Sequence, residues 1–246
     1  MSEASATQEK GGNANGQQPA PGMLIVGEAA SGKTTLLQQS AAKFYQSAPA
    51  ASLLYVGRAA DAERMKLRLP PERLLQGEKL PADKSYRSVV EALDAHSAAA
   101  TFGFTADEDT EQEALRCVRV VLQYVIEKGA EMSEDAPMIV ALDGLVSIAP
   151  RGDALNALLD LFTFALNAGS GFIPLITFEG FFILEQIFGP RGLDLFSRLG
   201  DIVLLRNQRD ERAIRLAQVV GNTDLRQLPK GRGLLISHAG LEFPPE

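Results

Sequence analysis

The sequence predicts an α/β fold with a mainly parallel central sheet, helices on both faces and antiparallel hairpins at the C-terminus. Two observations favour the parallel sheet. Short apolar runs that suit buried strands alternate with amphipathic stretches that suit helices. Some of these runs end in a glycine-rich loop or an acidic residue, at the place where open parallel sheets bind their ligands. A third observation favours the hairpins, because the last part of the chain shows strand patterns joined by turns.

Five apolar runs predict buried strands, in chain order at 23–26, 51–56, 137–142, 172–178 and 201–206. Amphipathic stretches predict helices from Leu36 onward and at 88–100, 110–129 and 154–167. Two short amphipathic pieces follow the fourth strand, and the charged, proline-interrupted region 58–80 is left without an element. The remainder predicts antiparallel strands at 213–220, 233–237 and 241–243, with turns at 209–210 and 239–240.

The helix that starts at Thr110 has the clearest pattern. Thr110 and Glu113 have the spacing of a capping box, and Gly129 is a suitable C-terminal stop. Apolar residues recur on one face of this helix, and Cys117 lies beside that face. We therefore interpret Cys117 as a packing residue, because buried free cysteines behave as small hydrophobic side chains.

The composition is that of one globular domain with a sizeable core. The chain has 246 residues, of which 46% are hydrophobic and 22% charged, ordinary values for a soluble protein. Its formal net charge of −7 argues against sequence-independent binding of nucleic acid, which needs a basic surface. The single cysteine excludes an internal disulfide and a cysteine-rich zinc cluster, and two histidines disfavour a histidine-based metal site.

We predict a disordered leader at residues 1–21, followed by a single domain at 22–246. The leader consists of small and polar residues without an apolar period. It contains no basic region followed by an apolar stretch, so no secretory signal is predicted. The most apolar window, 172–188, is short and contains two glutamates, so no membrane span is expected. The expected location is the cytoplasm.

The stretch GEAASGKTT follows the first strand and opens the first helix. It has the G-x-x-x-x-G-K-[ST] spacing of a phosphate-binding P-loop, also called Walker A. Its glycines permit a tight loop, and its backbone amides with the helix N-terminus form an anion site. Lys33 can reach the outer phosphates and the Thr34 hydroxyl can hold Mg²⁺. We assign nucleotide binding to Gly27, Glu28, Ala29, Ala30, Ser31, Gly32, Lys33, Thr34 and Thr35.

Two acidic residues at strand ends are candidates for the rest of the site. Asp143 follows the third strand and is predicted to hold Mg²⁺ with Thr34, although it could instead cap its own loop. Glu179 follows the fourth strand beside Thr177, and these two residues are candidate sensors of the γ-phosphate. Glu179 could instead cap the helix that begins near Phe181. The candidate catalytic residues are therefore Lys33, Asp143 and Glu179.

The order of these elements resembles that of the RecA superfamily, and within it the KaiC-like branch. The order is the P-loop, the second strand, the strand that ends in Asp143 and the closing strands. The opening PGMLIVGEAASGKTTLLQQ and the closing GDIVLLRNQRDERAIRLAQVVGNTD and GLLISHAGLEF carry most of a resemblance that covers residues 21–243. The resemblance implies a RecA-type core that binds ATP at subunit interfaces, in a homo-oligomer or with a different partner.

Two positions depart from the pattern of active KaiC-like ATPases. Those enzymes carry one or two glutamates just after the second strand, where the resemblance places Arg58 and Ala59. Those enzymes also supply a Lys-x-Arg, before a glycine in the last hairpin, to the phosphates of the neighbouring subunit. At this position the resemblance places the Gln-Val-Val-Gly of 218–221. Asp61 and Glu63 lie close enough to substitute for the base, although the geometry required of a general base is strict. Losing both groups predicts binding with slow turnover.

The sequence therefore predicts an ATP-binding regulatory or assembly module with weak or absent ATP hydrolysis. The candidate partner contact is the apolar segment 180–189, and the alternative is that this segment packs on its own sheet. A working ATPase completed by Glu63, Glu179 or a partner residue is the alternative. A DNA-binding recombination mediator is a second alternative, on the basis of a local cluster of four arginines at 206–215 that would otherwise be a solvated hairpin. A small-molecule kinase is a more remote hypothesis.

Overall fold

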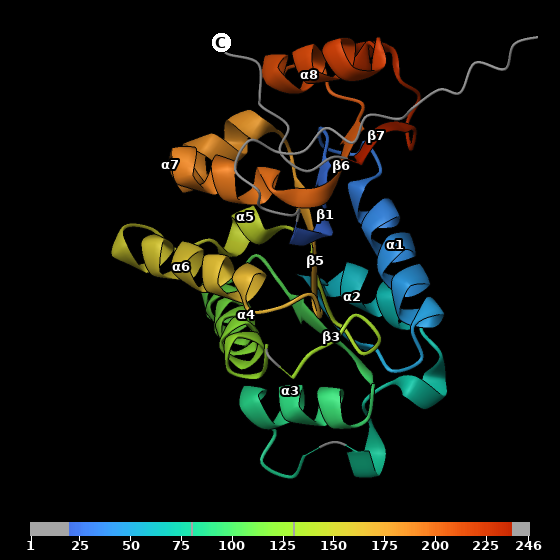
Figure 1. Ribbon diagram of the computed structural model, residues 1–246, viewed down its shortest axis with the longest axis vertical. Coiled ribbons are helices and arrows are strands. Elements are labelled where there is room, and N and C mark those ends of the chain that lie inside the picture. The colour runs from blue at the N-terminus through green and yellow to red at the C-terminus, as the bar shows by residue number, and fades with distance from the viewer. Residues whose placement is uncertain (1–19, 80, 130, 238–246) are drawn as a thin grey trace, which may run out of the picture.

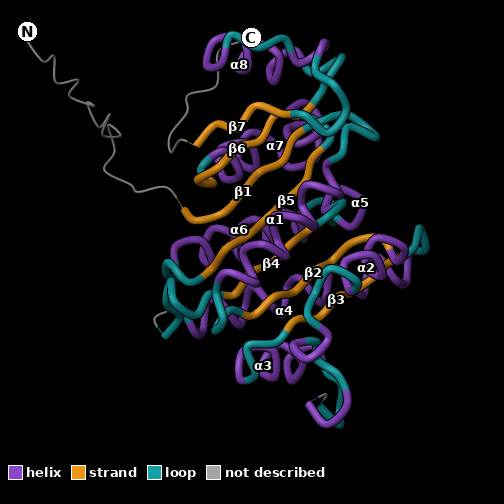
Figure 2. The backbone as a smooth tube through the Cα atoms, turned by 90° about the vertical axis from the view of Figure 1, so that its right-hand side faces the viewer, coloured by secondary structure: helices purple, strands orange, loops and turns teal. Residues whose placement is uncertain are grey.

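The computed structural model describes residues 20–237, apart from residues 80 and 130. A seven-stranded sheet runs through the molecule in the order β3-β2-β4-β5-β1-β6-β7 (Figure 1, Figure 2). Every neighbouring pair is parallel except β6 and β7, which are antiparallel. The strands are β1 Ala20–Val26, β2 Ser52–Arg58, β3 Ala99–Phe104, β4 Met138–Leu142, β5 Phe172–Phe178, β6 Leu199–Leu205 and β7 Gly233–Ser237.

Helices cover both faces of the sheet, as the sequence predicted. They are α1 Lys33–Ser47, α2 Ala59–Lys66, α3 Tyr86–Ala95, α4 Glu108–Lys128, α5 Leu145–Ile148, α6 Asp153–Asn167, α7 Phe181–Ser197 and α8 Glu211–Gly221. Successive side chains of a strand point to opposite faces, so β1 contributes Ile25 to a core under α1 and α2, and Leu24 to a larger core under α3–α8. The predicted α/β fold is confirmed, including the antiparallel pairing at the C-terminal end of the chain.

The edge of the sheet holds a strand that the sequence analysis missed. The predicted helix 88–100 is wrong beyond Ala95, where α3 ends, and the following residues form β3, which pairs with β2 in parallel. Ser97 has a left-handed backbone (φ 47°) between the two elements. The AATFGF sequence of β3 contains the aromatic and β-branched residues that strands favour, and this signal was outweighed by the alanines before it.

The predicted strand 213–220 is also wrong, because these residues lie in helix α8. Asp210 caps this helix by accepting a hydrogen bond from the Ala213 amide at 3.1 Å. The buried residues of α8 recur at helical spacing, namely Ala213, Ile214, Leu216 and Ala217. Val219 and Val220 are β-branched residues that would suit a strand, but they are exposed at the C-terminal end of the helix. The predicted turn 239–240 and strand 241–243 lie outside the described residues.

Smaller differences concern the ends of elements. Helix α4 begins at Glu108 and is capped by Asp107. The predicted capping box of Thr110 and Glu113 is therefore wrong, and the Thr110 hydroxyl instead accepts a hydrogen bond from the Thr105 amide at 3.2 Å. The last two residues of the predicted leader, Ala20 and Pro21, belong to β1, whereas 1–19 lie outside the described part of the chain. None of the helices among the described residues is long and apolar enough to cross a membrane.

Two interpretations of apolar residues as packing residues are confirmed. Cys117 is buried in the larger core, and burial raises the pKa of its thiol to about 12. In α7, which is kinked at Gly189, the side chains of Phe181, Leu184 and Phe188 are buried, whereas Phe182 is 62% exposed. The segment 180–189 therefore packs mainly on its own sheet.

Candidate functional site

The P-loop leaves the carboxyl end of β1 and is fixed by the two strands beside it. The Gly27 amide donates to the Phe178 carbonyl of β5 at 3.1 Å, and the Glu28 amide donates to the Arg206 carbonyl, just after β6, at 3.2 Å. Gly27 has no room for a side chain, because an added Cβ would lie 2.6 Å from the buried Ser31 hydroxyl oxygen. The glycine at this position is therefore required by close packing.

The rest of the loop has the shape and the free donors of an anion site. Ala30 and Gly32 have left-handed backbones, with φ of 59° and 107°, and Gly32 precedes α1 without a side-chain cap. Among the described residues, the amides of Ala29, Ala30 and Gly32 donate to no protein acceptor. The buried Ser31 hydroxyl also has no partner there. Unpaired amides at a helix N-terminus attract anions, so a phosphate fits this loop.

Lys33, the first residue of α1, lies across the loop. Its Nζ donates to the carbonyls of Gly27 at 2.7 Å and Glu28 at 2.8 Å. Burial lowers the pKa of Lys33, whereas the charges of Glu179, Asp143 and Glu28, in that order, raise it. The charges of the two predicted catalytic carboxylates, Glu179 and Asp143, therefore act on Lys33. A bound phosphate would offer the ammonium group a stronger acceptor than these carbonyls.

Asp143 follows β4 and is held by hydroxyl groups from two neighbouring strands. Its Oδ1 accepts from Thr177 Oγ1 on β5 at 2.7 Å, and its Oδ2 accepts from the Tyr55 hydroxyl on β2 at 3.2 Å. The carboxylate is 9% exposed. Burial, followed by the charge of Asp143, raises the pKa of Tyr55, so the tyrosine remains a neutral donor. The network fixes the orientation of the carboxylate.

Thr177 does not stand apart as a free sensor, because it also accepts from the Gly144 amide at 3.2 Å while it donates to Asp143. Glu179 is exposed at the end of β5. The alternative interpretation of Glu179 as a helix cap is wrong, since the Phe181 amide at the start of α7 donates to Asp210 Oδ2. The charge of the Glu179 side chain instead acts on Lys33 and raises the pKa of that lysine.

An ion pair between Glu28 and Arg206 was not expected from the sequence. Arg206 Nε donates to Glu28 Oε1 at 2.7 Å, and the Gln208 amide donates to Glu28 Oε2 at 3.1 Å. The pair joins the P-loop to the segment that follows β6. Because the two residues are 178 positions apart, no local spacing could have revealed it. The predicted nucleotide-binding role of Glu28 is thus accompanied by a structural one.

The end of β2, beside Asp143, carries no carboxylate at the two predicted positions. Arg58 ends the strand and Ala59 begins α2. Of the two proposed substitutes, Glu63 pairs with Lys66 at 2.6 Å on the exposed side of α2. Asp61 is nearer the site, since burial and then the charge of Asp143 raise its pKa. Asp61 also forms an ion pair with Arg64 at 3.1 Å.

The stretch 218–221 does not occupy a hairpin, because it forms the last turn of α8. A Lys-x-Arg followed by a glycine does occur further along, where Lys230, Gly231 and Arg232 precede β7. The Gly231 amide donates to the Ser31 carbonyl at 3.0 Å, so this segment rests on the P-loop. The spacing is readable in the sequence, but the expected strand at 213–220 directed the prediction to 218–221 instead.

The arginine cluster at 206–215 is spread over a strand end and a helix rather than a hairpin. Arg206 pairs with Glu28, and Arg212 pairs with Glu185 at 2.7 Å. The charges of Arg206 and Arg212 are therefore neutralised by neighbouring carboxylates. This arrangement gives the DNA-binding alternative no additional support.

The residues present fit a magnesium nucleotide. Among the described residues, no group of three or more His, Cys, Asp or Glu side chains could hold a metal ion without other ligands. Mg²⁺ commonly uses one or two protein ligands together with phosphates and water. Thr34 on the first turn of α1 and Asp143 at the end of β4 are the candidate ligands.

The structure resembles solved ATPases. The genome packaging NTPase B204 from Sulfolobus turreted icosahedral virus 2, in complex with AMP, matches with a TM-score of 0.52 and 9% identity over 92% of this chain and 98% of that one. VirB4 of Thermoanaerobacter pseudethanolicus matches with a TM-score of 0.56 and 10% identity over 91% and 90%. ATPases 2 and 3 of Thermomonospora curvata EccC match with a TM-score of 0.53 and 16% identity over 89% of this chain but 35% of that one.

No protein-family model and no curated protein sequence matches the chain. At identities of 9–16%, the likeness to these structures shows the fold. The chain has the fold of a P-loop NTPase. Its P-loop lies where that fold binds ligands, at the carboxyl end of the parallel strands.

Proposed function

We propose that this chain is an ATP-binding module of the KaiC-like branch of the RecA superfamily, which uses bound Mg·ATP to regulate or assemble with a partner and hydrolyses it slowly or not at all. One observation carries the proposal. Asp143 and Glu179 follow neighbouring parallel strands and their charges act on Lys33, whereas the adjacent end of β2 carries Arg58 and Ala59 in place of a base.

The binding half of the site would use the P-loop, its lysine and the carboxylate that follows β4. The free amides of the loop and the Lys33 ammonium would hold the phosphates. Thr34 and Asp143 would hold the magnesium ion, which neutralises phosphate charge when it is bound. Thr177 and Tyr55 keep the Asp143 carboxylate oriented. These roles would require positioning alone, and this hydrogen-bond network positions Asp143.

In the catalytic half, the end of β2 lacks a group suited to activate water. A general base contributes about 10²–10⁴-fold only when it lies within hydrogen-bond reach of the nucleophile. Glu63 is engaged with Lys66 on the exposed side of α2, and Asp61 with Arg64. Glu179 remains the candidate, and its charge acts on the Lys33 ammonium. The arrangement supports tight binding combined with slow turnover.

Binding and turnover should be measured on the same protein, with Lys33→Ala as the binding variant. We expect ATP affinity to fall about 10- to 100-fold, because a hydrogen bond from a charged donor contributes about 1.5–3 kcal/mol. The control is Lys43→Ala, which removes an exposed lysine from the same helix. Equal ATP affinity in Lys33→Ala and wild type would refute the assigned site.

A regulatory or assembly role predicts that nucleotide changes association. Sedimentation velocity of the wild type with and without a slowly hydrolysed ATP analogue should show a larger species when the analogue is present. Lys33→Ala should not respond at the same concentration. A sedimentation profile that is independent of nucleotide, at saturation, would contradict self-assembly through the RecA-type interface and turn the search to a different partner.

The alternative of an active ATPase is favoured by the Lys-x-Arg-Gly sequence at 230–233. If these cations complete a site, replacing both Lys230 and Arg232 with alanine should lower phosphate release by about 10³-fold, the effect of removing an arginine finger, with ATP affinity unchanged. Mixing this double variant with Lys33→Ala would restore turnover only if the cations act on a neighbouring subunit. Wild-type turnover no higher than that of Lys33→Ala excludes this alternative.

A further inference from the structure

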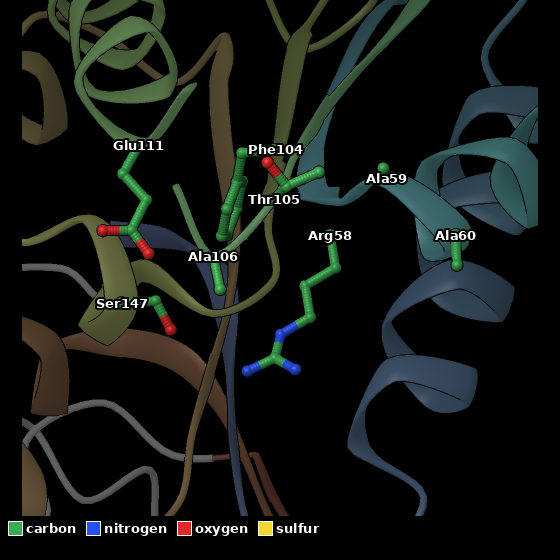
Figure 3. Close-up of a pocket in the computed structure, with 8 residues that line it drawn as sticks. All are labelled: Arg58, Ala59, Ala60, Phe104, Thr105, Ala106, Glu111 and Ser147. Atoms are coloured by element: carbon green, nitrogen blue, oxygen red, sulfur yellow. The ribbon is translucent and has the colours of Figure 1, made fainter. Parts of the chain in front are cut away.

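A pocket lies beside the candidate nucleotide site and takes no part in the roles assigned above. Its volume is about 210 Å³, enough for a small organic ligand, since one water occupies about 30 Å³ in the liquid. Four parts of the chain form it, namely the β2–α2 junction, the end of β3 with the segment after it, helix α4 and helix α5 (Figure 3). Its walls are partly apolar, with Phe104, Ala59 and Ala106 among the lining residues.

Two opposite charges line this pocket, and neither forms an ion pair within the described residues, although the Arg58 charge acts on Asp61. Arg58 contributes a guanidinium group from the end of β2, and Glu111 contributes a carboxylate from the first turn of α4. Neither side chain forms a hydrogen bond or an ion pair with the part of the chain that the structure describes. In Figure 3 the two residues enter from opposite sides, with Phe104 and Ala106 between them. The hydroxyls of Thr105 and Ser147 also line the pocket.

We propose that this pocket binds a small zwitterionic ligand of the α-amino acid class. A guanidinium group binds a carboxylate through paired, charge-assisted hydrogen bonds, and a carboxylate binds an ammonium group. An anion alone would be repelled by Glu111, and a cation alone would be repelled by Arg58. The phenyl ring and the alanine methyl groups would contact the apolar part of the ligand, as in most small-molecule sites.

The pocket is joined to the nucleotide site through two short connections, and this second part of the inference depends on the proposed function. Ser147 lies four positions after Asp143, and the Gly144 amide between them donates to Thr177. Arg58 ends the strand whose Tyr55 holds Asp143 Oδ2. A ligand that shifts either connection changes the position of the Asp143 carboxylate. Amino-acid binding should therefore alter ATP affinity, and ATP should alter amino-acid affinity by the same factor.

The first experiment is ligand-observed NMR of the nucleotide-free full chain with free L-amino acids as probes. At least one should bind, whereas its amide and its N-acetyl derivative, which lack the carboxylate and the ammonium respectively, should bind at least about tenfold more weakly. Arg58→Ala and Glu111→Gln should each weaken the amino acid by a similar factor. Arg116→Ala is the matched control, because it removes an exposed arginine from the same helix as Glu111.

Several results would overturn the inference. They are no binding of any amino acid at millimolar concentration, binding unaffected by both variants, or binding of inorganic phosphate that Glu111→Gln strengthens. Repeating the titration with Lys33→Ala separates the two claims, since the pocket should bind its ligand even when ATP does not bind. For the coupling, ATP affinity should change at least about fivefold at saturating amino acid, and an unchanged affinity would refute it.

Discussion

The ends of β4 and β2 are neighbours in the sheet, and they are built differently. At the end of β4, Asp143 is nearly buried and each carboxylate oxygen accepts a hydroxyl from an adjacent strand. At the end of β2, Arg58 is exposed and Ala59 offers no functional group. The sheet places both ends at the same edge, so the contrast reflects the residues rather than the fold.

This contrast separates two tasks that a nucleotide site can perform. Holding a metal and phosphates requires oriented charges, which in the proposed site the β4 side and the P-loop would provide. Cleaving the terminal phosphate also requires a group that positions or deprotonates water. The structure shows the first set of groups in a fixed network and the second position occupied by residues unable to act as a base. The comparison therefore predicts which changes abolish binding and which would create turnover.

The largest expected effect comes from adding the missing carboxylate at the end of β2. Arg58→Glu places a carboxylate at the end of β2, beside the Asp143 strand, and should raise phosphate release by about 10²-fold, the lower end of the range for a general base. The measurement is steady-state phosphate release with saturating Mg·ATP. The control is Arg64→Glu, which makes the same charge change at an exposed position of α2. An unchanged rate would show that a missing base does not limit turnover.

The β4 side is tested by Asp143→Asn, which keeps the shape and removes the charge. We expect ATP affinity to fall about tenfold in Mg²⁺, the lower end of the effect of losing a charged interaction, and to remain near the wild-type value in EDTA. Titrations in the two buffers measure this difference. Asp135→Asn, at an exposed loop position, is the control. Equal losses in both buffers would indicate a general disturbance of the loop rather than a lost metal ligand.

The sequence predicted the parts of the fold whose signals are local. The apolar runs at 137–142 and 172–178 became β4 and β5 almost without change, and the P-loop pattern located the turn into α1. The failures share a physical cause. In β3 and α8 the local composition is ambiguous, and burial against the rest of the molecule decides between helix and strand.

The residue types of the site were predictable from the sequence, but the hydrogen bonds and ion pairs between them were not. Lys33 and Asp143 follow from motif spacing at the ends of strands. That Tyr55 and Thr177 hold the carboxylate depends on the strand order β2-β4-β5, which the sequence does not specify. The ion pair of Glu28 with Arg206 likewise depends on β6 lying beside β1. Contacts between strands distant in sequence carry no local signal.

The smallest expected effect tests whether the network at the end of β4 orients Asp143. Tyr55→Phe removes the hydroxyl that donates to Asp143 Oδ2 and accepts from Gln38 Nε2 at 3.4 Å. We expect a loss of about 1–2 kcal/mol in the free energy of unfolding, measured in urea, because a buried carboxylate oxygen and a buried amide lose a partner. Affinity for Mg·ATP should fall only about twofold to fivefold, since Thr177 still holds the other carboxylate oxygen.

The matched control is Tyr86→Phe on α3, which removes a hydroxyl bonded to a carboxylate, that of Glu113. Helix α3 lies far from the start of α1 (Figure 1). Both variants should lose stability, because each leaves an acceptor without its donor, but only Tyr55→Phe should change the affinity for Mg·ATP. Equal nucleotide affinity in the two variants would show that the strand alone fixes Asp143. The difference between the ends of β4 and β2 would then rest on the carboxylate itself and not on the hydroxyls that surround it.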